Sequence, residues 1–210
     1  MQKNKIIKIS NKLVGDNQKT FIIAEVGLSH EGSLGIAKSF IDNISKAGAD
    51  AVKFQMHYPE YESSKYEKFR KKFSLQDRSR FDYWKRTSFN TTEWHKLKKY
   101  SEKKGLIFLC SPFSKKSVEI LANLKVEAWK IASGEFNNYL MLKQISKISK
   151  KPLILSTGLS TISEIKSVIN SNQIKNFSIL QCNSDYPTKP KEVGHKIVAK
   201  LKKNFSCPVG

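Results

Sequence analysis

Long apolar runs, paired cysteines and arginine are all scarce in this 210-residue sequence. No run reaches the 18 or so apolar residues of a transmembrane helix, and the basic segment from Met1 to Ser10 lacks the apolar stretch of a signal peptide. The three cysteines, Cys110, Cys182 and Cys207, show no C-x-x-C spacing, which excludes a disulfide framework. We therefore expect a cytoplasmic protein that does not associate with membranes.

Arginine makes up only 4 of the 38 basic residues; the other 34 are lysines, and with 18 acidic residues the formal charge is +20. Proteins that read bases and phosphates rely on the planar fork of arginine. Here the lysines are spread along predicted helices, as Lys96, Lys98 and Lys99 illustrate. We interpret them as solvated helix faces and expect no nucleic-acid partner, although such a field also attracts anionic substrates.

Short apolar runs alternate with stretches of helical spacing, which predicts an α/β protein with a parallel sheet covered by helices. The helical stretch Ile36–Ala47 is expected to stop at Gly48, and Ser114 is expected to cap the helix that follows it. The predicted strands are Phe21–Val26, Ala51–Met56, Leu106–Cys110, Ala128–Ala132, Leu153–Ser156 and Ser178–Cys182.

Six βα units without a G-x-G-x-x-G turn favour a TIM (β/α)8-type barrel over a dinucleotide-binding sheet. A complete barrel takes about 250 residues, so residues 1–210 are expected to form an incomplete one, with a seventh strand beginning at Cys207–Val209. Residues 1–20 are predicted to form a hairpin that turns at Gly15-Asp16-Asn17. Residues 58–90 form an aromatic-rich insertion loop, of a kind that is often functional.

The predicted strands end in polar residues, which converge on one face of a barrel. Two lysines lie within strands, where a buried ammonium must be paired or lose its proton. Together with nearby hydroxyls they predict a pocket for a phosphate dianion, flanked by two carboxylates able to act as acid or base. The candidate residues are Lys53, Lys130, Ser111, Ser133 and Ser156, with Glu25 and Glu135 as the carboxylates.

The four histidines show no metal-binding spacing such as H-E-x-x-H. We interpret His57 as an ordinary surface or loop histidine and place His95 and His195 on helix surfaces. For His30 the sequence leaves a loop position and a functional one equally open.

Six motifs at these strand ends carry a resemblance. They are Ala24-Glu25-Val26-Gly27-x-x-His30-x-Gly32, Gly48-Ala49-Asp50-Ala51-Val52-Lys53-Phe54-Gln55, Ser111-Pro112-Phe113, Lys130-Ile131-Ala132-Ser133-Gly134-Glu135, Ser156-Thr157-Gly158 and Cys182-x-Ser184-x-Tyr186-Pro187. In this order they resemble the N-acetylneuraminate (sialic acid) synthase family, which includes legionaminic and pseudaminic acid synthases. The motifs depart from the family pattern at Ser29, where asparagine is common, and at Cys110-Ser111, where Ser-Thr is common.

The resemblance implies a TIM-barrel enzyme that condenses phosphoenolpyruvate with an N-acetylated hexosamine and releases phosphate. It assigns phosphoenolpyruvate binding to Lys53, Ser111, Lys130, Ser133 and Ser156, proton chemistry to Glu25 and Glu135, and the sugar pocket to Gln55, Tyr186 and His30. It also implies a divalent metal (Mn²⁺ or Mg²⁺) with ligands beyond Gly210, a homodimer for the full-length protein, and a C-terminal antifreeze-like domain that this chain lacks together with the last strands. On that basis we expect the 210 residues alone to be inactive.

Three alternatives stay open at this point: another phosphoenolpyruvate–aldose synthase, a Schiff-base aldolase with Lys53 or Lys130 as its nucleophile, and a catalytically silent barrel fragment. The sequence does not choose the hexosamine.

Overall fold

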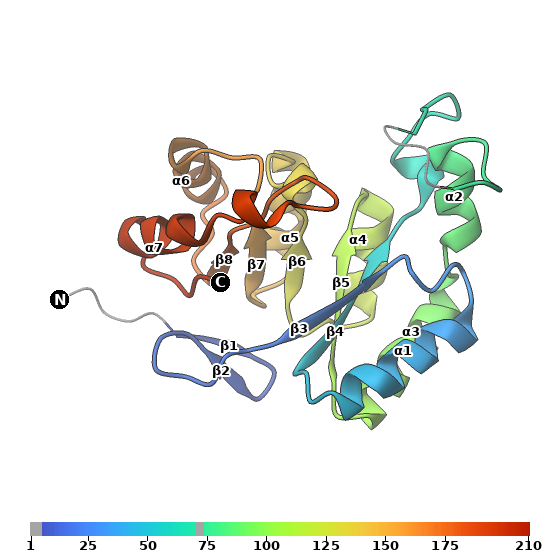
Figure 1. Ribbon diagram of the computed structural model, residues 1–210, viewed down its shortest axis with the longest axis horizontal. Coiled ribbons are helices and arrows are strands. Elements are labelled where there is room, and N and C mark those ends of the chain that lie inside the picture. Colours follow the sequence, from blue (N-terminus) through green and yellow to red (C-terminus); the bar gives the residue numbers. More distant parts are fainter. Residues whose placement is uncertain (1–5, 70–73) are drawn as a thin grey trace. The chain divides into compact units, whose positions relative to one another are not determined.

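The computed structural model describes residues 6–69 and 74–210 of the chain (Figure 1). Its internal contacts divide it into two compact units. The first unit comprises residues 22–126. The second unit comprises residues 127–210 together with the N-terminal segment that ends at Phe21.

The first unit is built on a three-stranded parallel sheet in the order β3-β4-β5. Helices α1, α3 and α4 pack against these strands or against one another. Its elements are β3 (Ile23–Gly27), α1 (Leu34–Lys46), β4 (Ala51–Met56), the 3₁₀ turn η1 (Pro59–Tyr61), α2 (Arg80–Thr87), α3 (Thr91–Lys103), β5 (Ile107–Pro112) and α4 (Lys115–Asn123).

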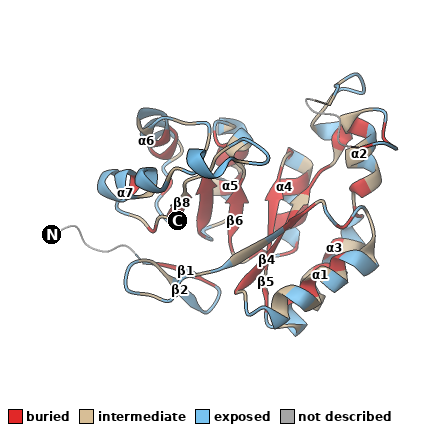
Figure 2. Cartoon of the chain, viewed as in Figure 1, coloured by how far each residue is buried: buried red, intermediate tan, exposed pale blue. Residues whose placement is uncertain are grey.

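Local sequence signals place the ends of these helices. The Ser33 side chain caps α1, and Gly48, with a φ of 78°, follows that helix as predicted. The Ser114 side chain caps α4, also as predicted. Strands β4 and β5 are almost wholly buried, as Figure 2 shows in red. The two apolar faces of these strands explain why their sequences read as continuous apolar runs.

Residues 58–90 are more structured than the insertion loop that the sequence predicted, because they contain η1 and the helix α2. Part of the insertion, residues 70–73, lies outside the described residues. The guanidinium of Arg86 on α2 binds the buried Asp77 carboxylate at 2.8 and 2.9 Å and the Glu31 carboxylate at 2.8 Å. The bond from Arg86 lowers the pKa of Asp77. Through these ion pairs Arg86 connects the insertion to Glu31 in the loop after β3.

Gly32 in that same loop is expected to tolerate no side chain. Its φ is 78°, and a Cβ at this position would lie 2.4 Å from the backbone oxygen of Arg86. Gly32→Ala should lower the free energy of unfolding by at least about 2 kcal/mol, measured by urea denaturation, since backbone strain and a backbone clash both contribute. Gly48→Ala is the matched control: it has the same φ, but no atom lies within 4 Å of its Cβ position. Equal losses in the two variants would contradict the close contact between Gly32 and α2.

The second unit contains a three-stranded parallel sheet in the order β6-β7-β8. Val209 forms a further parallel bridge with Ile179 of β8, and the Gln181 N–H donates to the Gly210 oxygen at 2.8 Å. Of the next strand predicted at Cys207–Val209, the structure contains this bridge at Val209, whereas Cys207 lies in a bend. The elements are β6 (Trp129–Ile131), η2 (Ser133–Glu135), α5 (Tyr139–Ile148), β7 (Leu153–Ser156), α6 (Ile162–Ser171), β8 (Phe177–Leu180), η3 (Pro190–Glu192) and α7 (His195–Asn204).

The N-terminal hairpin exists, but its predicted turn was wrong. Strands β1 (Ile7–Ile9) and β2 (Lys12–Val14) pair antiparallel around a turn at Ser10-Asn11, where Ser10 has a φ of 53°. The predicted Gly15–Asn17 turn follows the hairpin instead and is closed by a bond from the Gln18 N–H to the Gly15 oxygen. The part of the predicted hairpin before Ile6 lies outside the described residues.

Candidate functional site

Lys53 on β4 is the centre of a polar cluster in the first unit. Its residue is only 5% exposed, and its ammonium lies 2.6 Å from a carboxylate oxygen of Glu25 on β3 and donates to the Ser111 hydroxyl on β5 at 3.1 Å. The parallel register brings these neighbours together, since Glu25 pairs with Lys53 across β3 and β4. An ammonium has three N–H donors. One of them has no partner among the residues that the structure describes, and it is available to an acceptor oxygen of a ligand.

Gln55 lies two residues beyond Lys53 on β4, so the two side chains point to the same face of the strand. A Cβ placed on Gly27 would lie 3.5 Å from Oε1 of Glu25 and 3.7 Å from Nε2 of Gln55. The Gln55 amino group and the Glu25 carboxylate therefore flank Gly27 at the end of β3. Glu25 is half exposed, so this cluster reaches solvent through its carboxylate.

Lys130 on β6 is the corresponding lysine of the second unit. Its residue is 6% exposed, and its ammonium donates to the Ser156 hydroxyl on β7 and, at 3.1 Å, to the backbone oxygen of Ile131. In each unit, therefore, a buried lysine donates to a serine on the next strand. This repeated pairing satisfies two ammonium groups that an apolar core would not tolerate alone.

The predicted Ser156-Thr157-Gly158 motif connects three segments of the second unit. The Thr157 hydroxyl donates to the Leu180 oxygen of β8 at 3.1 Å, and the Gly158 N–H donates to the Ser133 hydroxyl at 3.2 Å. A Cβ on Gly158 would lie 2.5 Å from the backbone oxygen of Cys182. Ser133 is thereby held beside the end of β7, the strand that carries Ser156.

Glu135 and Tyr186 also belong to the second unit. Glu135 ends η2, directly after β6, and its Oε2 accepts a bond of 2.9 Å from the side-chain amide of Asn138, which caps α5. Tyr186 follows β8, and its side chain is 81% exposed. Glu135 therefore follows the strand that carries Lys130, whereas Tyr186 lies on the surface.

His30 is fully buried in an aromatic cluster of the first unit. Its ring stacks on Phe89 with centroids 4.5 Å apart and lies 5.9 Å from the Phe54 ring. Its Nδ1 accepts a bond of 3.1 Å from the Gly32 N–H, and its Nε2 has no partner within the described ranges. Burial lowers the pKa of His30 to about 4, so the ring is neutral near pH 7 and its Nδ1 lone pair holds the loop after β3.

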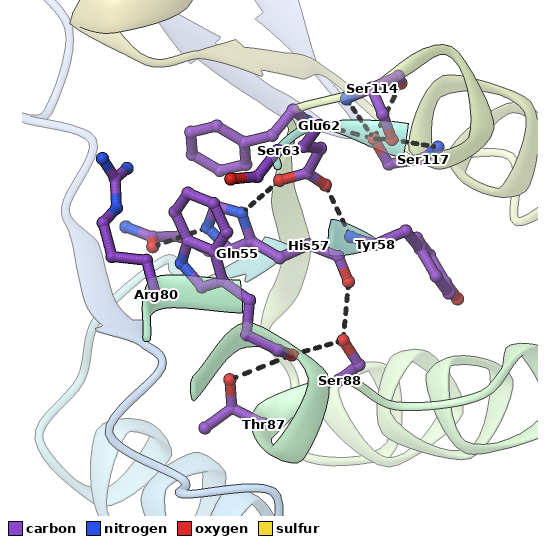
Figure 3. A network of polar contacts seen from close by, with 12 residues as sticks. Gln55, His57, Tyr58, Glu62, Ser63, Arg80, Thr87, Ser88, Ser114 and Ser117 are labelled. Carbon is purple, nitrogen blue, oxygen red and sulfur yellow. Dashed lines mark hydrogen bonds and ion pairs between the residues drawn. The ribbon is translucent and has the colours of Figure 1, made fainter. Parts of the chain in front are cut away.

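His57 was predicted to be an ordinary surface or loop histidine, and this prediction was wrong. Its ring is buried between Trp84 of α2 and Phe113, with centroid separations of 4.6 and 4.0 Å. Its Nδ1 lies 2.7 Å from the buried Glu62 carboxylate, and its Nε2 lies 3.4 Å from Oε1 of Gln55 (Figure 3). The aromatic content of residues 58–90 was the only sequence signal for such a stack, and it did not identify the histidine's partners.

The resemblance implied a divalent metal. Within residues 6–69 and 74–210, no three His, Cys, Asp or Glu side chains gather in a way that would hold a metal ion. The described residues therefore do not fit a metal centre. None of the helices in the described ranges has both the length and the apolar character of a membrane span.

Parallel βα units with lysine-centred clusters on their strands define an α/β protein with candidate groups for binding an anionic ligand. The family model of the NeuB family matches residues 40–210. The chain belongs to the NeuB family, which confirms the resemblance carried by the six motifs.

Individual relatives agree with this assignment. The chain is 38% identical over 207 residues to an uncharacterized protein of Methanocaldococcus jannaschii, covering 97% of this chain and 58% of that protein. It is 34% identical over 201 residues to the N,N'-diacetyllegionaminic acid synthase of Campylobacter jejuni, covering 92% of this chain and 60% of the relative. A crystal structure of the N-acetylneuraminic acid synthetase of Leptospira borgpetersenii superposes with a TM-score of 0.84 at 30% identity, covering 99% of this chain and 69% of that one. The chain thus spans about 60% of the length of the curated relatives it matches.

Proposed function

We propose that this chain carries the phosphoenolpyruvate-binding part of a synthase that makes a nonulosonic acid, a nine-carbon sugar acid, from an N-acetylated hexosamine. The observation that carries the proposal is the Lys53 cluster, in which a buried ammonium bonded to Ser111 and Glu25 keeps one N–H donor available. The motifs shared with the NeuB family support it. So does the Leptospira relative, whose crystal structure is a complex with citrate, an anion rich in carboxylates.

Phosphoenolpyruvate presents a phosphate and a carboxylate, which ammonium and hydroxyl donors neutralise. We assign that binding to Lys53 and Ser111 of the first unit and to Lys130, Ser133 and Ser156 of the second. Gln55, Tyr186 and His30 remain predicted pocket residues. We further propose that the two sheets belong to a TIM barrel, as the sequence predicts.

The proposed reaction forms one carbon–carbon bond. The enol carbon of phosphoenolpyruvate attacks the open-chain aldehyde of the sugar, and water then adds to the carbon that bears the phosphate ester. The tetrahedral intermediate breaks its bond to the ester oxygen and releases inorganic phosphate. Glu25 and Glu135 handle the protons: one is donated to the aldehyde oxygen and one is taken from the attacking water.

Calorimetric titration of the chain with phosphoenolpyruvate tests this proposal. We expect saturable binding that weakens as salt is added, because the ligand is a multiply charged anion. Absence of binding would contradict the proposal. A Schiff-base aldolase would instead form a lysine adduct when pyruvate and borohydride are added, which mass spectrometry detects; we expect no such adduct.

A further inference from the structure

The carboxamide of Gln55 connects two polar groups of the first unit. At one end its Oε1 lies 3.4 Å from Nε2 of His57. At the other end its Nε2 and the Glu25 carboxylate both approach Gly27, at 3.7 and 3.5 Å from the position of a Cβ on that glycine. The oxygen of the carboxamide therefore faces the buried histidine, and its amino group lies on the side of Glu25.

Gln55 also belongs to the same face of β4 as Lys53, and it pairs in register with Ser111 across β4 and β5. An amino group held there adds N–H donors to a face that already presents the Lys53 ammonium and the Ser111 hydroxyl.

The His57 ring that contacts Gln55 is itself held from several sides. The Arg80 guanidinium lies 4.5 Å from the Trp84 ring, Trp84 stacks on His57 with an interplanar angle of 6°, and His57 stacks on Phe113. The Ser88 hydroxyl donates to the backbone oxygen of His57 at 2.8 Å (Figure 3). The ring is thereby fixed by α2, by the end of β5 and by the segment after α2.

Glu62 holds the Nδ1 side of the His57 ring. Its Oε1 accepts a bond of 2.5 Å from the Tyr58 N–H, and its Oε2 lies 2.7 Å from Nδ1 of His57. A carboxylate in this position accepts from both groups, so Nδ1 donates. The other ring nitrogen, Nε2, lies opposite Gln55, at 3.4 Å from Oε1 of its carboxamide.

We propose that His57 and Glu62 are positioning residues that hold the Gln55 carboxamide on the face of β4 that carries Lys53. The inference rests on the proposed function and deepens it. It gives the insertion at residues 58–90 a role, since Glu62 and Trp84 both lie within it. The insertion thereby positions a side chain of β4 beside the proposed ligand site.

The first test uses the ligand-free chain and needs no binding. The side-chain amide signal of Gln55 is assigned by its loss in Gln55→Met, in ¹H–¹⁵N spectra. Glu62→Gln, which keeps the shape of the side chain, is expected to shift that signal. Glu60→Gln is the matched control, because Glu60 is exposed on η1 and lies 3.9 Å from Lys85. An unmoved Gln55 signal in Glu62→Gln would overturn the proposal.

The second test is a double-mutant cycle on phosphoenolpyruvate affinity, measured by calorimetry. Glu62→Gln and His57→Phe, which keeps a ring in the stack, are each expected to weaken binding about 3- to 10-fold. In the Gln55→Met background neither should weaken it further, because both act through Gln55. Additive losses would mean that the two residues merely support the fold, and would overturn the proposal. If the unmodified chain failed to bind phosphoenolpyruvate, the proposed function would fall, while the amide signal would still decide the positioning role.

Discussion

Lys53→Met is expected to weaken phosphoenolpyruvate binding about 10- to 100-fold while leaving the chain folded. Methionine fills nearly the same volume, but it removes the ammonium that binds Ser111 and neutralises Glu25. A hydrogen bond to a charged group contributes about 1.5–3 kcal/mol, which corresponds to this range of affinity. In the variant the Glu25 carboxylate also loses its ammonium partner, which leaves an acidic group beside the anionic ligand.

Calorimetry measures the loss, and circular dichroism confirms that the variant is folded. Lys98→Met is the matched control, because it removes the same charge from a lysine that pairs with Glu102 on the surface of α3. A similar loss in both variants would show that the general positive field, rather than the Lys53 cluster, attracts the ligand. An unchanged affinity in Lys53→Met would remove this residue from the proposed site.

Glu135→Gln is expected to lower turnover about 100- to 10,000-fold and to leave phosphoenolpyruvate affinity nearly unchanged. A residue that moves a proton acts mainly in the transition state, whereas a residue that anchors the substrate acts in binding as well. The Asn138 amide donates a hydrogen bond to the Glu135 carboxylate. The carbonyl oxygen of a glutamine can accept the same bond, so the variant should keep the position of the side chain.

The measurement is phosphate release from phosphoenolpyruvate and N-acetylmannosamine, in a protein extended to the full length of the relatives. Glu127→Gln serves as the control, since Glu127 pairs with Lys151 in the same unit. Equal losses in affinity and turnover for Glu135→Gln would make Glu135 a substrate anchor instead. Unchanged turnover would remove it from the mechanism.

The strands were the most predictable part of this chain. Strands β4 and β7 have the bounds that the sequence predicted, because each is an apolar run buried on both faces and bordered by turn residues. The hairpin turn was not predictable in the same way. Gly15-Asp16-Asn17 has the composition of a turn, whereas the chain reverses at Ser10, a residue type that gives no signal for a positive φ.

The polar clusters were predictable as candidates, but their partners were not. Lysines inside apolar strands must find acceptors, and this requirement identified Lys53 and Lys130. Which serine each lysine binds depends on the register between neighbouring strands. His57 shows the limit more clearly, because its burial depends on Trp84 and Phe113, which lie far along the chain and reach it only in the folded unit.

The most direct test of phosphoenolpyruvate binding is a titration followed at individual lysine ammonium groups. In ¹H–¹⁵N spectra of the lysine side chains, the Nζ signals of Lys53 and Lys130, each assigned by its Lys→Met variant, are recorded as phosphoenolpyruvate is added. We expect both signals to shift saturably while that of Lys98 stays in place. If neither buried lysine responded, or if Lys98 shifted as strongly as both, phosphoenolpyruvate binding at these clusters would be contradicted.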